Sequence, residues 1–181
     1  WEWQFISKSR IDASNSDIRR FAYDDTLPWP TAADGASFSM VLIAPGTNPD
    51  HALGSNWRSS TAVGGNPGSS DSVDFSGDPD GDDDGDGLSN FLEHALGVDS
   101  PAIEASADPD VAGGLLFMFP RNLAADDVLI EVQSSTDLRN WTTAQATMID
   151  STSQGDGTAI ETWAIAPSFG SSGKLYVRVA V

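Results

Sequence analysis

The chain contains no cysteine among its 181 residues. Disulfide bonds and thiolate metal sites are therefore excluded as sources of stability or chemistry. Basic residues are also scarce, because 9 lysines and arginines stand against 27 aspartates and glutamates, a formal net charge of -18. Such a charge opposes binding to nucleic acid and to anionic membrane surfaces, which are themselves polyanions. Divalent cations are the partners that this composition favours.

Long apolar runs and the short motifs of common enzymes are missing as well. The longest wholly apolar run, residues 115–120, is far too short to cross a bilayer, so we expect no membrane insertion. The sequence has no phosphate-binding loop, dinucleotide fingerprint or nucleophile elbow. His51 and His94 have no cysteine partner and no HExxH spacing, which gives a zinc site little support. We therefore expect that the protein is not an enzyme.

Enough apolar sequence is present for folded cores. Apolar residues make up 39% of the chain and aromatic residues 9%, values compatible with packed domains at this length. The sequence begins Trp1-Glu2-Trp3, without an initiator methionine or an apolar leader. We expect a mature or trimmed piece of a longer protein, with a signal peptide upstream of the residues seen here.

Twelve residues near the middle of the chain, 82–93, match the loop of an EF-hand. Calcium takes about six to eight oxygen ligands, and such a loop supplies them from alternate positions and from a final glutamate, around a glycine that makes a sharp turn. The consensus pattern is matched without a mismatch. The predicted calcium ligands are the side chains of Asp82, Asp84, Asp86, Asn90 (directly or through water) and Glu93, with the main-chain carbonyl of Leu88.

The loop lies in a dense acidic run. Six aspartates fall within residues 78–86, and they repel one another strongly unless a cation neutralises them. A solvated, disordered linker is the alternative interpretation, but it leaves the glycine, asparagine and glutamate of the motif unexplained. Asp78 and Asp80 belong either to a second, overlapping site or to the charge outside the coordination shell. We expect calcium to order an otherwise expanded loop and to fix the angle between the β-rich parts on either side.

Apolar periodicity predicts a mainly β protein with one short helix. Before the acidic run, strand-length apolar stretches such as residues 37–43 are broken by Pro, Gly, Asp and Asn. Residues 64–72 are rich in Gly and Ser and are predicted to form a flexible linker. Residues 88–96 have helical spacing, and Gly97 is placed as a C-cap. No comparable helical pattern precedes the loop.

The last third of the chain carries the clearest strand patterns. Apolar and polar residues alternate in 128–133 and in 175–181, and residues 154–157 form a predicted hairpin turn. We expect antiparallel β-sandwich modules joined by the EF-hand-like calcium loop and its short helix. The predicted organisation is a partial β region at 1–74, the calcium loop and helix at 75–100, and an antiparallel β-sandwich at 101–181.

Residues 21–68 resemble the second half of a lamin-tail domain. The residues that carry the resemblance are Tyr23, Pro28-Trp29-Pro30, Ala33-Asp34-Gly35, Ser39, Leu42, Asn56-Trp57 and Asn66-Pro67-Gly68. Such domains occur in large secreted bacterial proteins, often beside CotH-like kinase domains. The resemblance implies an immunoglobulin-like β-sandwich for this part of the chain.

Residues 78–101 are similar to the calcium repeats of thrombospondin type 3 and dockerin type in bacterial surface proteins. The matching residues are 84–90, Glu93, 95–97 and Asp99. In that class the loop and its exiting helix join β domains, and no entering helix is required. Residues 131–141 resemble a β module that often closes such proteins.

These features predict a non-catalytic calcium-binding structural or adhesion module of a larger secreted or cell-surface bacterial protein. The expected partners are calcium, other domains of the same parent chain, and extracellular polysaccharide or other surface proteins. Two alternatives stay open. One is a carbohydrate-binding module of a secreted polysaccharide-active enzyme. The other is a subunit of an extracellular filament, in which residues 1–6 complete the sheet of a neighbouring copy.

Tryptophan bears on the carbohydrate alternative. Tryptophan side chains either form a sugar-stacking platform or pack in cores and turns, and the second role is commoner in β domains. Trp29 lies between two prolines in a predicted turn, which makes it the best platform candidate. The six tryptophans are Trp1, Trp3, Trp29, Trp57, Trp141 and Trp163.

Overall fold

The computed structural model describes residues 20–99, 101–166 and 173–181. Within these ranges the chain is mainly β, with three antiparallel sheets, one α-helix and three short 3₁₀ helices. The prediction of a mainly β fold with antiparallel sheets and one short helix is confirmed. In the part of the chain that is described, no helix combines the length and the apolar character needed to span a bilayer. The strand predicted at residues 1–6, with Trp1 and Trp3, lies outside the described residues.

A two-stranded sheet organises the N-terminal part. Strands β1 (Met40–Leu42) and β2 (Trp57–Ser59) pair antiparallel, so the strand predicted at 37–43 is present in shorter form. Most of the remaining chain in this part is irregular. The 3₁₀ helices are Thr31–Ala33, Pro45–Thr47 and Gly54–Asn56.

An aromatic cluster forms the core of the N-terminal part. The Trp29 ring stacks on those of Phe21 and Trp57, with centroid distances of 6.4 and 6.5 Å. A β-carbon at Gly54 would come within 2.9 Å of the Trp29 indole, so this close approach requires glycine. Trp29 is only 8% exposed. This burial favours the commoner packing role over the sugar platform for which Trp29 was the best candidate, because a stacking platform must present an open face.

The other described tryptophans also make packing contacts. Trp163 lies against the main core of the C-terminal part, and its ring stacks on Phe119 at a centroid distance of 6.5 Å. The ring of Trp141 is covered by the guanidinium of Arg178, whose central carbon lies 4.3 Å from the ring centroid. Packing in cores and turns therefore describes these residues better than a shared flat platform.

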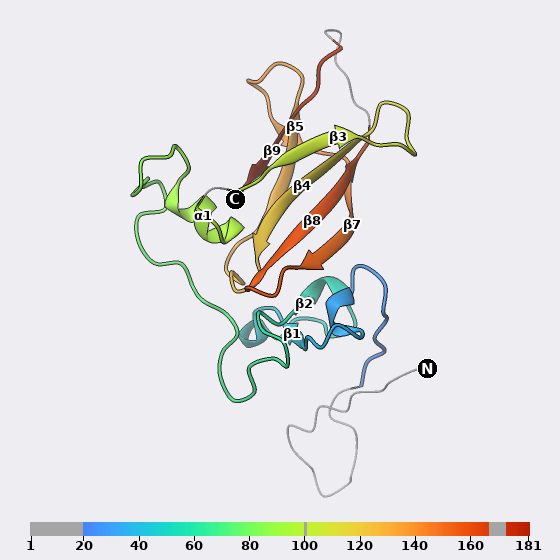
Figure 1. Cartoon of the computed structure of the whole chain (residues 1–181), viewed down its shortest axis with the longest axis vertical. Helices are drawn as coiled ribbons and strands as arrows, with labels where there is room; N and C mark the ends of the chain where they lie inside the picture. The colour runs from blue at the N-terminus through green and yellow to red at the C-terminus, as the bar shows by residue number, and fades with distance from the viewer. Residues whose placement is uncertain (1–19, 100, 167–172) are drawn as a thin grey trace, which may run out of the picture.

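Two antiparallel sheets form the C-terminal part (Figure 1). The strand orders are β3-β4-β8-β7 and β6-β5-β9. The β7–β8 hairpin turns at residues 154–157, as predicted, and the strand patterns at 128–133 and 175–181 appear as β5 and β9. The strands are β3 (Glu104–Ala107), β4 (Leu115–Asn122), β5 (Glu131–Ser135), β6 (Thr142–Thr143), β7 (Ala146–Ser153), β8 (Thr158–Ile165) and β9 (Tyr176–Ala180).

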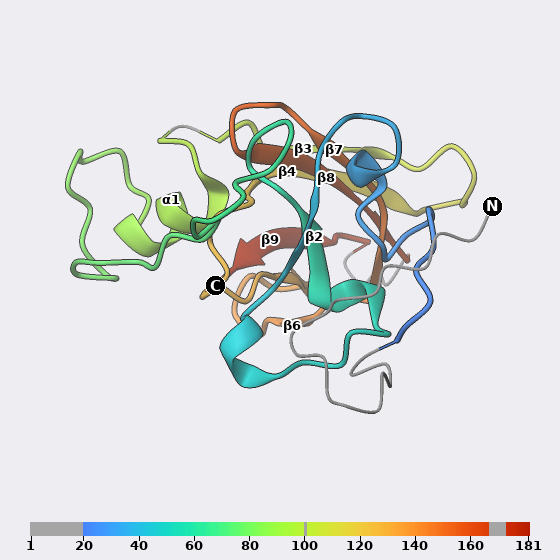
Figure 2. The same cartoon turned by 90° about the horizontal axis from the view of Figure 1, so that it is seen from below.

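Side chains from both sheets and from the helix share one core. In Figure 2, β9 of one sheet lies across from β4 and β8 of the other. Phe119 and Leu96 are completely buried. Burial of a side chain of this size stabilises the fold by about 1.5–3 kcal/mol. The buried members are Leu96 before Gly97, Phe117 and Phe119 of β4, Val132 of β5 and Ile165 of β8.

The helix α1 (Asn90–Leu96) is docked on the C-terminal sheets. The Ser89 hydroxyl caps its first turn by accepting the Leu92 N–H at 3.3 Å. Gly97 ends it in the left-handed conformation, which confirms the predicted C-cap. The helix begins at Asn90 rather than at residue 88, because Ser89 is its N-cap and has an extended backbone. Its apolar end is buried against β4 and the β4–β5 connection.

The connection between β4 and β5 holds two other segments. The Ala124 carbonyl accepts the Val73 N–H at 2.9 Å, and the Asp127 carboxylate accepts the Phe75 N–H at 2.7 Å. The same carboxylate lies 3.1 Å from the His94 Nε2 on α1. Burial raises the pKa of Asp127, and hydrogen bonds from Phe75 and His94 lower it by more. His94 thus pairs with Asp127 and packs against Phe75.

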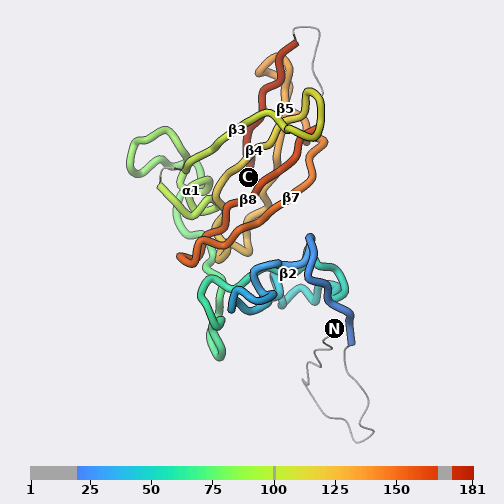
Figure 3. Tube along the Cα trace, turned by 45° about the vertical axis from the view of Figure 1, so that its right-hand side comes forward, coloured from blue at the N-terminus to red at the C-terminus, as the bar shows by residue number. Residues whose placement is uncertain are grey.

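Arg58 joins the N-terminal part to this same connection. Its Nη1 lies 2.6 Å from Asp71 and its Nε 2.6 Å from Asp126, and the arginine is 7% exposed. Asp71 also accepts the N–H and the hydroxyl of Thr61. The predicted flexible linker at 64–72 therefore folds back and is held at its end. Figure 3 shows the two parts meeting below β7 and β8.

Candidate metal site

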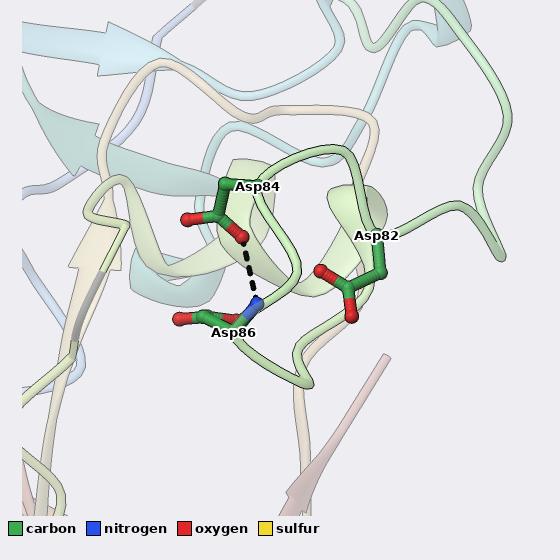
Figure 4. Close-up of side chains that lie close together, drawn as sticks. All are labelled: Asp82, Asp84 and Asp86. Atoms are coloured by element: carbon green, nitrogen blue, oxygen red, sulfur yellow. Dashed lines mark hydrogen bonds between the residues drawn. The ribbon is translucent and has the colours of Figure 1, made fainter.

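Three carboxylates come together on the loop that precedes α1. Asp82, Asp84 and Asp86 each present an oxygen within 4.8 Å of an oxygen from the other two. All three side chains are exposed, and Figure 4 shows them around one turn of the loop. Carboxylate oxygens at this spacing can share one hard cation. The cluster could therefore bind a metal ion.

The same carboxylates shape the turn. One oxygen of Asp82 accepts the Gly85 N–H at 2.8 Å, and the other accepts the Gly87 N–H at 3.1 Å. Both glycines have positive φ, 78° and 97°, which other residues adopt at a cost. Asp84 accepts the Asp86 N–H at 3.1 Å. The backbone of the loop is thus arranged by the side chains that would contact the cation.

Two further predicted ligands are tied to the loop backbone. The Leu88 N–H donates to the Asp86 carboxylate at 2.8 Å. The Asn90 side chain bridges the loop, because its oxygen accepts the Asp83 N–H at 3.1 Å and its nitrogen donates to the Asp78 carbonyl at 3.2 Å. Asn90 therefore closes the loop onto the segment that leads into it.

Glu93, in the first turn of α1, is affected by the charge of the loop. Partial burial raises the pKa of Glu93, and the negative charges of Asp84 and Asp86 raise it further. Its carboxylate is not one of the group that lies within 4.8 Å. A cation held by the loop would favour the ionised form of Glu93, because an opposite charge reverses the effect of the aspartates.

Asp78 and Asp80 shape the approach to the loop. The Asp78 carboxylate accepts the Asp80 N–H at 3.2 Å, and the Asp78 carbonyl accepts the Gly81 N–H at 3.1 Å. The Gly81 carbonyl in turn accepts the Asn90 N–H at 2.7 Å. Among the described residues, the carboxylates of Asp78 and Asp80 are not in a group of three or more candidate ligands. These contacts favour the interpretation that they lie outside the coordination shell.

Phe75 is a site-supporting residue that the sequence pattern did not reveal. In the described part of the chain no helix stands between β2 and α1. Phe75 packs against the exiting helix, with centroid distances of 5.1 Å to Phe91 and 5.4 Å to His94. A lone phenylalanine in a polar stretch was the available signal, but it does not say which surface the ring will meet.

Comparisons with protein families, curated proteins and solved structures find no match to this chain. The resemblances to lamin-tail domains and to thrombospondin or dockerin repeats therefore stay predictions. The chemistry of the loop itself is what indicates a function.

Proposed function

We propose that this chain is a non-catalytic calcium-binding structural module of a larger secreted or cell-surface bacterial protein. One observation carries the proposal: Asp82, Asp84 and Asp86, at the first three ligand positions of a complete calcium-loop sequence, have oxygens within 4.8 Å of one another. The loop offers only oxygen ligands, which suit hard cations. Calcium fits better than magnesium, because the motif supplies six oxygen ligands from the protein, whereas magnesium usually keeps several of its waters.

A structural role is favoured over a sensor role by the packing of α1. A calcium sensor exposes an apolar surface when its helices move apart. Here Ala95 and Leu96 are 1% and 0% exposed, packed into the cores of the C-terminal part. The loop is also tied at its other end, where the Phe75 N–H donates to Asp127. Calcium would therefore order a loop whose two ends are already fixed.

Composition supports a location outside the cell. Extracellular calcium modules bind with dissociation constants of about 10⁻⁴–10⁻³ M, which matches an exposed site on a loop. The absence of cysteine and the net charge of -18 fit a protein that is stabilised by calcium rather than by disulfides. Other domains of the parent chain and surface polysaccharides or proteins are the partners of such a module.

Calcium is expected to slow amide hydrogen exchange in the loop and α1. The N–H groups of Gly85, Gly87 and Leu88 donate to carboxylates that calcium would hold in place. Chelation with EDTA should speed their exchange by about 10- to 100-fold, and amides of β8 should be unaffected. Hydrogen-exchange mass spectrometry measures the exchange rates of peptides from 78–97 and 158–165, with calcium and with EDTA.

A dye-binding measurement, made beside the hydrogen exchange, separates a structural site from a sensor. An apolar fluorescent dye added to the protein should bind no better with calcium than with EDTA. A calcium-dependent rise in dye fluorescence would contradict the structural role. Equal exchange rates in the loop with calcium and with EDTA would contradict calcium binding itself.

A further inference from the structure

A cleft of about 220 Å³ lies where the N-terminal part meets the end of the C-terminal sheets. One wall comes from residues 27–31 and 55–59, and the other comes from β4, β7 and β8. Figure 1 shows β1 and β2 next to this end of the four-stranded sheet. The cleft is therefore complete only when the two parts are docked.

A charged pair in the cleft has unused hydrogen-bonding capacity. Glu161 of β8 is 5% exposed, and its Oε2 accepts the Trp163 indole N–H at 2.9 Å. Its Oε1 lies 3.7 Å from the Arg121 Nε, which is too far for a hydrogen bond. Among the described residues, this ion pair is the one polar contact of the Arg121 side chain. The Glu161 carboxylate can therefore still accept hydrogen bonds, and the neighbouring Arg121 guanidinium can still donate them.

The charges in and around the cleft leave no surplus of positive charge. Arg121 and Glu161 neutralise each other, and Arg58 is held by Asp71 and Asp126 on the far side. Without surplus positive charge the cleft offers no net attraction to an anion, and the overall charge of -18 opposes one. The best ligand is therefore a neutral molecule that donates and accepts hydrogen bonds.

A β-bulge brings further polar groups to the cleft. The register of β7 against β8 shifts between Met148 and Asp150. In a regular strand, Met148 and Ser151 would point to opposite faces, because successive side chains alternate. With the bulge, Met148, Ser151 and Ser153 all line the cleft. The bulge thus adds two hydroxyl groups beside the charged pair.

Aromatic surface completes the lining. Trp57 and Trp163 both contact the cleft, and indole rings pack well against C–H groups. The volume is below the roughly 300–1,000 Å³ of pockets for drug-sized ligands, so one small ring fits better than an oligomer. A small ring with an apolar C–H face and hydroxyl groups at its edge is a sugar.

We propose that this cleft binds one ring of a neutral sugar. Its hydroxyl groups bridge Arg121 and Glu161, and its C–H face packs on an indole. None of the residues that line the cleft belongs to the calcium loop or α1. A failure of one proposed site would therefore leave the other proposal intact. The site is a cleft between two parts of the chain, and it differs from the exposed platform that was the less favoured alternative for Trp29.

Saturation-transfer NMR with small sugars tests the proposal. The probes are glucose, galactose, mannose, xylose and N-acetylglucosamine, with glucuronate as an anionic comparison and leucine as a zwitterionic one. We expect saturable binding of at least one neutral sugar and none of the two comparison compounds. Binding of no neutral sugar, or preference for glucuronate or leucine, overturns the proposal.

Two variants locate the binding site. Ser151→Leu fills the cleft, and Arg121→Met removes its free donors, so each should weaken binding of the sugar by about tenfold or more. Thr147→Leu is the matched control, because Thr147 is exposed and does not line the cleft. It should leave affinity unchanged. Sugar binding that survives both cleft variants overturns the proposal, and circular dichroism checks that each variant is folded.

Discussion

Replacing Arg58 with methionine is expected to lower the unfolding free energy by about 3–5 kcal/mol, the usual cost of removing one partner from a buried ion pair. The guanidinium donates to Asp126 at 2.6 and 3.1 Å and to the Asp71 side chain at 2.6 Å. The two aspartate side chains are 6% and 11% exposed. Methionine keeps the length of the side chain but leaves two buried carboxylates without a counter-charge. The N-terminal part should then separate readily from the β4–β5 connection.

The effect of this substitution depends on pH. Burial raises the pKa of Asp71, but hydrogen bonds from Arg58 and Thr61 lower it by more, so its folded-state pKa lies below the ordinary value. Its contribution to stability is complete above the ordinary aspartate pKa of about 4, and it is lost as the pH falls through the folded-state pKa. Without Arg58 the folded-state pKa rises. The difference in stability between wild type and Arg58→Met should therefore narrow as the pH falls below about 4, through the lowered pKa of Asp71 in the folded wild type.

Urea unfolding followed by tryptophan fluorescence measures this loss. Arg178→Met is the matched control, because Arg178 is exposed and donates to Gln133 at the surface. It should cost less than about 1 kcal/mol. Neutralising all three groups, with Arg58→Met, Asp71→Asn and Asp126→Asn combined, should restore much of the stability, since no buried charge is left unpaired. An Arg58→Met variant as stable as Arg178→Met would show that the ion pair does not hold the two parts together.

Calcium is expected to raise the unfolding temperature of the wild type but not that of Glu93→Ala. With a dissociation constant of about 10⁻⁴–10⁻³ M, about 10 mM calcium stabilises the folded state by roughly 1.4–2.7 kcal/mol. That corresponds to a rise of about 3–10 °C for a chain of this length. In EDTA the wild type should unfold at the same temperature as Glu93→Ala or at a lower one. Asp84 and Asp86 repel the Glu93 carboxylate and raise its pKa, and the alanine substitution relieves this repulsion.

Asp83→Ala is the control for this experiment. It removes the same charge from the same loop, but Asp83, unlike Glu93, does not occupy a ligand position of the calcium-loop motif. Its variant should keep the full response to calcium. Scanning calorimetry with calcium, with EDTA and with magnesium gives the comparison. An equal rise with calcium in wild type and Glu93→Ala would mean that calcium acts somewhere other than this loop.

Local sequence signals predicted much of the C-terminal fold. The β7–β8 hairpin follows from two alternating runs around Gly155 and Gly157, both of which adopt positive φ. The end of α1 follows from Gly97, whose left-handed conformation has a clear sequence signature. These features depend on residues within a few positions of one another, which is why a single sequence reveals them.

Contacts between distant residues were not predictable in the same way. Arg58 and Asp126 are far apart in the sequence, and nothing in the Gly- and Ser-rich pattern of 64–72 indicates that Asp71 is buried beside them. The burial of Trp29 depends on stacking with Phe21 and Trp57. The cleft beside Glu161 likewise requires both parts of the chain to be docked.

The candidate metal site was predictable in part, since some of its features are local in the sequence and others depend on distant residues. Its residue types and spacing predicted the cluster of Asp82, Asp84 and Asp86, because ligands from one short loop need no distant partner. The sequence did not predict that the Asn90 side chain would bridge Asp83 and Asp78, nor that Phe75 would pack on α1. Those contacts decide how the loop is held against the rest of the chain.

Isothermal titration of calcium into the metal-free chain tests the calcium site most directly. We predict one saturable site with a dissociation constant of about 10⁻⁴–10⁻³ M. Binding should be lost in Asp84→Ala, which removes one of the three convergent carboxylates, and retained in Asp83→Ala. No saturable binding by the wild type, or equal binding by Asp84→Ala, would contradict a calcium site at residues 82–93.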